Sequence, residues 1–360
     1  MSLLPPGMML SVTKVGTSPS VKKAFYGETA DGRRVEQFTL TNSKGAEAKI
    51  ITFGGIITCL KVPDKNAKMG NIVLGYNSLA EYENDKFYIG ALIGRCANRI
   101  SGGRFVLHGK THQLTKNNGQ NSLHGGSRGF DKVVWTGRGF VNKSGANLEL
   151  TYLSSDGEEG YPGHLNVKVV YTLTENNELE IDYYAMSDAE TIVNLTQHSY
   201  FNLAGQGDVL SHWLQINAAR FTPTNKDAIP TGELKAVQGT AFDFTSPTSI
   251  GWRINERDEQ LLFGRGYDHN WVLNKNGKAL SLAARLFESG SGRRMEVWTT
   301  EPGLQFYAGN FLRSPLIYRG GLCLEAQNFP DAPNRPDFPS PVLKKGEIYR
   351  QTTVYKFSVN

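Results

Sequence analysis

The sequence has little cysteine, no long apolar run and no run of charges of one sign. Its three cysteines, Cys59, Cys96 and Cys323, show no CxxC spacing and cannot all pair with one another, which argues against a disulfide framework or a cysteine-based zinc site. The apolar N-terminal LLPPGMML is short, interrupted by Pro5 and Pro6, and preceded by no basic residue. It is therefore a poor signal peptide and too short to span a bilayer. We expect a cytoplasmic protein with no membrane partner.

Nucleotide and nucleic-acid signatures are also missing. The net charge of +5 comes from 39 basic and 34 acidic residues spread along the chain, so no basic patch predicts nucleic acid as a partner. The sequence contains no GxGxxG after a predicted strand, no P-loop and no HExxH. These absences remove the usual nucleotide-binding and zinc-protease interpretations. We expect no cofactor and no metal.

Alternation of apolar and polar residues with period two dominates the 360-residue chain. It runs through residues 148–152, 167–173 and 179–183, and predicts strands with one buried face. The ENNE at residues 175–178 and the SGSG at residues 289–292 each separate two such runs, which predicts antiparallel hairpins. With 39 glycines and 15 prolines falling mostly between the runs, we predict an all-β sandwich or barrel.

Helix signals are scarce, and nothing in the sequence resembles a linker between domains. The clearest helix start is Ser78, followed three residues later by Glu81 as in a capping box. We expect a short helical turn from there to Asp85. The length alone suggests two domains. Because all-β folds often run long as one domain, a single domain over residues 21–360, after a flexible tail at residues 1–20, remains open.

Asn194 to Leu203, which reads NLTQHSYFNL, is more polar than an ordinary core strand. His198 stands in its middle. A single histidine at a strand end is more often a structural side chain than a functional one, so its meaning depends on the rest of the chain. One reason to keep these polar groups together is that they face a molecule rich in hydroxyl groups, with the histidine moving a proton on it.

Five further stretches combine glycine and polar residues inside β-rich sequence. Asn98 and Arg99 follow an apolar run, His124 precedes two glycines, Asp268 lies in YDHN, Gln305 lies among aromatic residues, and Glu325 ends an apolar strand. Four of these stretches have ordinary alternatives: a structural ion pair for Arg99, a glycine turn at His124, an Asx-turn at Asp268 and core packing around Gln305. A carboxylate such as Glu325 that closes a buried strand is costly unless it is paired or used.

Together these motifs resemble the aldose 1-epimerase (galactose mutarotase) family. Six of them occur in the family's order: GRCANRI, LHGGSRGFDKVVW, NLTQHSYFNL, YDHN, TTEPGLQFY and CLEAQNFPDAPN. The resemblance extends from about Phe38 to the C-terminal region at Lys356. It implies a large antiparallel β-sandwich of the galactose mutarotase-like type, with few short helices and a sugar in a cleft across one sheet. It also implies an enzyme that interconverts the α and β anomers of free hexoses such as D-galactose and D-glucose.

Carried over by motif, the resemblance implies site residues and their roles. The general acid falls on His198 and the general base on Glu325. The sugar-binding groups fall on Asn98, Arg99, His124, Tyr200, Asp268 and Gln305. The family needs no metal and no cofactor. One departure is that the stretch between Gln305 and Glu325 is shorter than in the animal enzymes, which bears on loop contacts and on the range of substrates.

Two alternatives remain open on the same fold. A sugar-phosphate 1-epimerase would need a basic cluster to hold the phosphate, for which Arg99, Arg104 and Arg128 are available. A non-catalytic sugar-binding module would keep the hydroxyl-binding residues and lose the acid or the base. In either case the partner is a small sugar, and we expect a monomer or weak dimer.

Intrinsic acidities lead to an expectation about the acid. With reference pKa values of about 4.3 for Glu and about 6.5 for His, an ionised Glu beside a protonated His is the natural state only between those values. Neutral pH lies above that window. We therefore expect a neighbouring carboxylate, Asp268 or Glu325, to raise the pKa of His198.

Overall fold

The computed structural model describes residues 18–359. The flexible tail expected at residues 1–20 lies outside this part except for residues 18–20, of which Ser20 begins the first strand. None of the helices within residues 18–359 has the length and apolarity needed to cross a membrane. The strands of every sheet pair with their neighbours in antiparallel fashion, as the alternating pattern predicts.

The first main sheet has five strands in sequence order. They are β1 (Ser20–Glu28), β2 (Arg34–Thr41), β3 (Glu47–Ile51), β4 (Ile57–Pro63) and β5 (Met69–Asn71).

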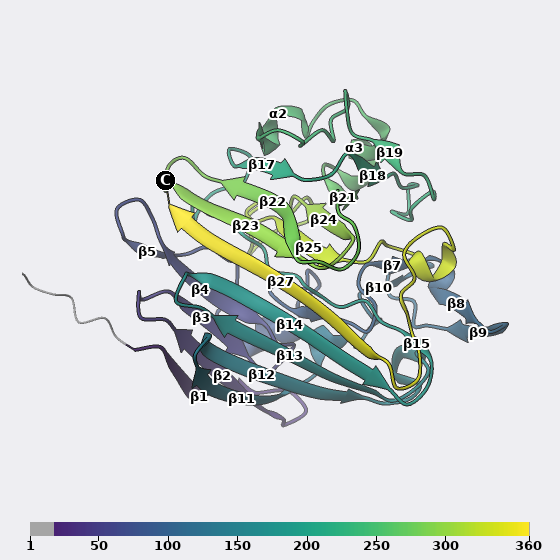
Figure 1. Ribbon diagram of the computed structural model, residues 1–360, viewed down its shortest axis with the longest axis horizontal. Coiled ribbons are helices and arrows are strands. Elements are labelled where there is room, and N and C mark those ends of the chain that lie inside the picture. Colours follow the sequence, from purple (N-terminus) through teal and green to yellow (C-terminus); the bar gives the residue numbers. More distant parts are fainter. Residues whose placement is uncertain (1–17, 360) are drawn as a thin grey trace, which may run out of the picture.

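The second sheet has nine strands and crosses the front of the molecule in Figure 1, with the C-terminal strand β27 running diagonally through it. In spatial order its strands are β11 (Thr136–Asn142), β12 (Gly145–Ser154), β13 (Leu165–Leu173), β14 (Glu178–Ser187), β27 (Ile348–Val359), β23 (Arg293–Thr299), β22 (Ser281–Phe287), β17 (Trp213–Ile216) and β20 (Thr248–Ser249). The two expected hairpins are confirmed as β13–β14 and β22–β23.

The third main sheet again has five strands: β19 (Lys235–Ala236), β18 (Arg220–Thr222), β21 (Asp268–Val272), β24 (Gly303–Tyr307) and β25 (Cys323–Gln327). The described chain also has four two-stranded sheets: β6 (Leu92–Ile93) with β16 (Thr196–Gln197), β7 (Arg99–Ile100) with β10 (Ser122–Leu123), β8 (Arg104–Leu107) with β9 (Lys110–Gln113), and β15 (Thr191–Ile192) with β26 (Val342–Leu343).

Helices are few and short in the described chain. They are α1 (Leu79–Glu83), α2 (Ile250–Arg253), α3 (Glu259–Gly264) and the 3₁₀ turns η1 (Ser101–Gly103), η2 (Phe130–Lys132), η3 (Glu158–Gly160) and η4 (Ala332–Asn334). The expected capping residue is confirmed, since Ser78 caps α1 and accepts a hydrogen bond from the Glu81 N–H.

One large hydrophobic core joins the three main sheets. It contains Ile50 of β3, Leu150 of β12, Val297 of β23 and Phe306 of β24, all buried. The nine-stranded sheet therefore covers both five-stranded sheets through its inner face, as in a sandwich. The expected antiparallel β-sandwich is confirmed.

The two faces of the third sheet differ in chemistry. Because successive strand residues point to opposite faces, Phe306 and Leu324 face the core, while Gln305 and Glu325 face the other way. Gln305 and Glu325 lie opposite each other on neighbouring strands. The sheet thus presents a polar face, backed by apolar packing, to the segments that carry the other motifs.

Candidate active site

Glu325 lies in the middle of β25, at the centre of the polar face. Its side chain is 2% exposed. Gln305 of β24 lies beside it, and Asn270 of β21 lies beside Gln305 in the next strand. This register puts three chain segments that are distant in sequence into one row of polar side chains.

His198 follows β16 directly, in a segment that lies next to β25. Its backbone N–H donates to the Ala91 carbonyl, and its own carbonyl accepts from the Gly90 N–H. The hydroxyl of Thr196 donates to the Ala326 carbonyl at 2.8 Å, which joins the histidine segment to β25. These bonds hold the backbone on both sides of the imidazole.

The imidazole of His198 and the carboxylate of Glu325 are close neighbours. Nε2 of His198 is 3.7 Å from Oε1 of Glu325, and the two side chains are 5% and 2% exposed. Among the described residues, Oε2 of Glu325 has no hydrogen-bond partner, although it is buried. A buried carboxylate oxygen without a partner is costly, so this position has unused hydrogen-bonding capacity.

His124 stands against His198 with its ring nearly perpendicular. The ring centroids are 5.1 Å apart. The Asn98 N–H donates to Nδ1 of His124 at 3.2 Å, and the His124 N–H donates back to the Asn98 carbonyl at 3.0 Å. In a neutral ring whose Nδ1 accepts, Nε2 carries the hydrogen. His124 is therefore a hydrogen-bond donor at Nε2.

The glycines after His124 serve the packing of this segment. Gly125 has φ +92°, and a Cβ there would lie 1.9 Å from the Gly94 carbonyl oxygen. The backbone at Gly94 therefore occupies the space next to Gly125 that a side chain would fill. It joins the His124 loop to the segment that leads to Asn98.

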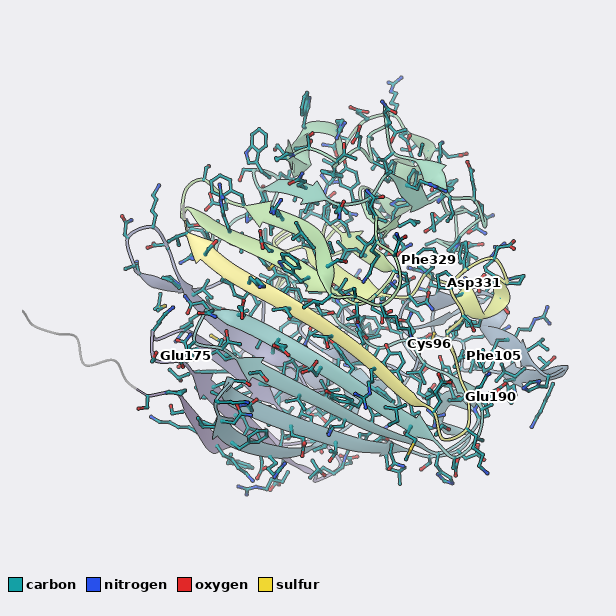
Figure 2. The ribbon with its side chains drawn as sticks, in the orientation of Figure 1. Cys96, Phe105, Glu175, Glu190, Phe329 and Asp331 are labelled. Atoms are coloured by element: carbon teal, nitrogen blue, oxygen red, sulfur yellow. The ribbon has the colours of Figure 1, made fainter. Side chains whose placement is uncertain are left out.

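Arg99 is held by two loops. Its Nε donates to Oδ1 of Asn118 at 3.1 Å, and its carbonyl accepts from the Asp331 N–H at 2.8 Å. Asp331 also accepts from the Ser101 N–H at 2.9 Å. Figure 2 shows Asp331 close to Phe329, just beyond the end of β25. The segment that follows Glu325 is therefore fastened to the segment that carries Arg99.

Asp268 and Gln305 form a second polar pair on the same face. Nε2 of Gln305 donates to Oδ1 of Asp268 at 2.8 Å. Within residues 18–359, several buried atoms of this face lack hydrogen-bond partners: Oε1 of Gln305, Oδ1 of Asn270 and both amide atoms of Gln327. Such a concentration of unused donors and acceptors suits a ligand that carries many hydroxyl groups.

Tyrosine rings pack around the histidines. Tyr200 packs against His198 with centroids 5.2 Å apart, and its hydroxyl donates to the Phe87 carbonyl at 2.8 Å. Tyr88 contacts both His124 and His198, at 4.6 and 5.8 Å between centroids. Sequence reasoning missed Tyr88, because its neighbours form no motif and only the fold brings its ring to the histidines.

Burial controls the ionisation of the His198–Glu325 pair. It lowers the pKa of His198 to about 4 and raises the pKa of Glu325 well above its usual value, with the charge of Asp268 adding to that rise. The expectation that a carboxylate raises the pKa of His198 is therefore wrong, because loss of water disfavours the imidazolium more strongly. At pH values between the pKa of His198 and the pKa of Glu325, the two side chains together hold one proton, which is on Glu325.

Three donor atoms are close enough to be compared with a metal site. One side-chain nitrogen each from His124 and His198 and one carboxylate oxygen of Glu325 lie within 4.8 Å of one another. A metal ligand needs a free lone pair, and the hydrogen bond to Nδ1 of His124 leaves a hydrogen on its Nε2. The three side chains therefore fit hydrogen bonding and proton exchange better than metal coordination.

The arginines available for a phosphate do not converge on this site. Arg128 is exposed and extends to Asp31 at 3.8 Å, and Arg104 is an exposed residue at the start of β8. Of these three arginines, Arg99 is the one whose charge acts on Glu325. A binding site for a sugar phosphate has no support in this arrangement.

Comparison with known sequences places this site in context. The family described as Aldose 1-epimerase matches residues 36–356. The galactose mutarotase of Sus scrofa is 46% identical over 351 residues, covering 94% of this chain and 99% of that protein. The aldose 1-epimerase of Escherichia coli strain K12 is 37% identical over 337 residues, covering 91% and 96%.

Solved structures show the same architecture. A galactose 1-epimerase from Lactobacillus acidophilus NCFM superposes with a TM-score of 0.86 at 30% identity, covering 95% of this chain and all of that one. An aldose epimerase homologue from C. elegans gives a TM-score of 0.81 at 29% identity, covering 95% and 99%.

Proposed function

The chain belongs to the aldose 1-epimerase family, as the six motifs lead one to expect, and from this premise we propose how its own side chains carry the reaction. The enzyme is an isomerase that interconverts the α and β anomers of free hexoses such as D-galactose and D-glucose. We propose His198 as the general acid and Glu325 as the general base.

Changing one anomer into the other requires the ring to open and to close again on the other face. Opening moves one proton off the hydroxyl on C1 and another onto the ring oxygen, which leaves poorly as an alkoxide. A base and an acid positioned at these two oxygens each contribute typically about 10²–10⁴-fold to the rate. The sugar thus needs two proton-exchanging groups very close together.

The separation of His198 and Glu325 carries the proposal. Nε2 and Oε1 are 3.7 Å apart, which suits two groups that serve oxygens bonded to the same carbon. A sugar-binding module could keep the surrounding polar residues without such a pair. The close approach of an imidazole and a carboxylate, both buried, favours the enzyme over the module.

The single proton of the pair sets up the reaction. Moved from Glu325 to Nε2 of His198, it yields a carboxylate and an imidazolium, which hydroxyl groups of a bound hexose stabilise by hydrogen bonding. Glu325 then takes the proton from the C1 hydroxyl while His198 gives its proton to the ring oxygen, and the bond from C1 to that oxygen breaks. The products are an open-chain aldehyde, a neutral carboxyl group and a neutral imidazole. After rotation about C1–C2, the two proton transfers run backwards.

The surrounding residues bind and orient the hexose. Arg99 and His124 donate to sugar oxygens, and the positive charge of Arg99 favours the ionised form of Glu325. Asp268 and Gln305, which are hydrogen-bonded to each other at 2.8 Å, form hydrogen bonds with neighbouring hydroxyl groups of the hexose. Asn98 and Tyr200, the other two proposed sugar-binding residues, also hold the histidines in place: the Asn98 N–H donates to Nδ1 of His124, and the ring of Tyr200 packs against His198.

Three broader features complete the proposal. Residues 21–360 form a single domain, the enzyme is a monomer or weak dimer, and it works in the cytoplasm. Support for the last point is that Cys59, Cys96 and Cys323 are all free thiols, the form that a reducing compartment maintains.

Polarimetry of freshly dissolved sugar tests the function. A catalytic amount of the protein should speed the approach of α-D-galactose to its equilibrium rotation, and α-D-glucose should also respond. Glucose 6-phosphate should be the poorer substrate, because Arg104 and Arg128 do not reach the site. Acceleration of the phosphorylated sugar alone would favour the sugar-phosphate epimerase, and no acceleration of any sugar would favour the binding module.

The pH dependence of kcat/KM should follow the proton count of the pair. Below about pH 4, His198 gains a proton while Glu325 keeps its own, so no base remains. Above the raised pKa of Glu325, the pair loses its proton and no acid remains. We expect kcat/KM to be constant between about pH 4 and the raised pKa of Glu325. In Asp268→Asn the alkaline limb should move to lower pH, because the charge that raises the pKa of Glu325 is gone. An alkaline limb that stays in place would contradict this assignment.

A further inference from the structure

Cys323 lies next to the second ring nitrogen of His198. Its Sγ is 3.5 Å from Nδ1. Cys323 and Glu325 are two residues apart on β25 and therefore share the polar face. Both the thiol and the imidazole are buried. The imidazole thus has the Cys323 sulfur at Nδ1 and the Glu325 carboxylate at Nε2.

The proposed reaction places a strict demand on the two ring nitrogens. Nε2 must give a proton to the ring oxygen of the sugar and later take one back. Between these events the ring is neutral and carries one hydrogen. That hydrogen must stay on Nδ1, because a neutral ring with its hydrogen on Nε2 has no lone pair there to accept the returning proton.

We propose that Cys323 is a positioning residue whose sulfur accepts the Nδ1–H of His198 and so reserves Nε2 for proton exchange with the sugar. The proposal rests on the proposed function, since it assigns Nε2 the proton-exchanging role. The Cys323 side chain touches no reacting atom in this scheme. It acts by fixing the tautomer and the orientation of the imidazole. In other catalytic histidines, the group hydrogen-bonded to the second ring nitrogen has the same role.

The sulfur can keep this acceptor role throughout the cycle. Burial raises the pKa of the Cys323 thiol well above its usual value, and ionisation of Glu325 would raise it further, so the group stays a neutral thiol at physiological pH. A neutral thiol is a weak acceptor. It directs the hydrogen to Nδ1 without the strong charge stabilisation that would hold the ring as an imidazolium.

The test combines tautomer and turnover measurements on the whole protein. Nitrogen NMR of histidine labelled with ¹⁵N in its ring distinguishes a protonated Nδ1 from a protonated Nε2, and the His198 signals are identified by their loss in His198→Asn. At neutral pH without sugar, wild-type His198 should carry its hydrogen on Nδ1. In Cys323→Ala the hydrogen should shift toward Nε2, and kcat should fall by at least about tenfold with little change in KM.

Two further variants separate positioning from packing. Cys323→Ser keeps an acceptor at the same place and should recover the Nδ1 tautomer and most of the turnover. Cys96→Ala removes another buried thiol, which donates a hydrogen bond to the Ala97 carbonyl at 3.8 Å. This variant should leave both the His198 tautomer and kcat unchanged.

The result that overturns the proposal is a wild-type His198 with its hydrogen on Nε2. An unchanged tautomer and kcat in Cys323→Ala would overturn it equally. The NMR measurement needs no turnover, so it stands apart from the proposed function, which fails instead if His198→Asn remains active. Should Cys323→Ala unfold, the tautomer of the wild type and of Cys323→Ser decides the question.

Discussion

His198→Asn is expected to lower kcat for the interconversion of galactose anomers by about 100- to 10,000-fold, the range that one general acid contributes. Asparagine is polar but does not ionise near neutral pH, so nothing remains to protonate the ring oxygen. The dissociation constant for galactose should change only a few-fold, because the other polar residues of the face still bind the hydroxyl groups. Polarimetry gives the rate, and calorimetry with galactose gives the affinity.

A second buried histidine provides the matched control. His212 is fully buried, and its Nε2 accepts the Leu203 N–H at 3.0 Å. His212→Asn therefore removes a buried imidazole away from the site, and the folded part of that preparation should keep its kcat. Near-normal turnover in His198→Asn would remove His198 from the role of acid. An equal loss in both variants would point to general destabilisation.

Glu325→Gln is expected to have an effect of similar size. The amide has nearly the same shape and still hydrogen-bonds a hydroxyl group, but it cannot take the proton from C1–OH. It also removes the site of the single proton that the pair holds. Turnover should fall by about 100- to 10,000-fold while galactose still binds, so the loss should appear in kcat and leave the affinity within a few-fold.

Glu301→Gln is the control for a partly buried carboxyl group. Burial raises the pKa of Glu301 to about 7, and Glu301 lies between β23 and β24, outside the polar row of Gln305 and Glu325. Its replacement should leave kcat unchanged. Retained turnover in Glu325→Gln would show that another group removes the C1–OH proton. Complete loss of galactose binding in that variant would make Glu325 a binding residue first.

The sheets were accessible from the sequence because their signal is local. Alternation in β12, β13 and β14 follows directly from the burial of every second side chain, and the turns at residues 175–178 and 289–292 fix the hairpins. The layering of the three main sheets and the exact strand order are not local. The alternating pattern predicts a sandwich or a barrel, and only the resemblance to the family selects the sandwich.

The site was predictable only in part. The motif resemblance named His198 and Glu325, but nothing in either segment specifies that their side chains meet at 3.7 Å. The pKa of His198 was predicted in the wrong direction because the charges are visible in a sequence and the extent of burial is not. Tyr88 and the contact between Cys323 and His198 depend on tertiary packing and carry no local signal.

The central claim is that the sugar binds with its ring oxygen at His198 and its C1 hydroxyl at Glu325. A crystal structure of Glu325→Gln with bound galactose tests it directly, because this variant is expected to bind galactose without turning it over. We predict Nε2 of His198 within about 2.6–3.2 Å of the ring oxygen and the side-chain amide of residue 325 within the same distance of the C1 hydroxyl. A galactose whose C1 lies away from both side chains, or one in which both side chains contact the same oxygen, would contradict the assignment.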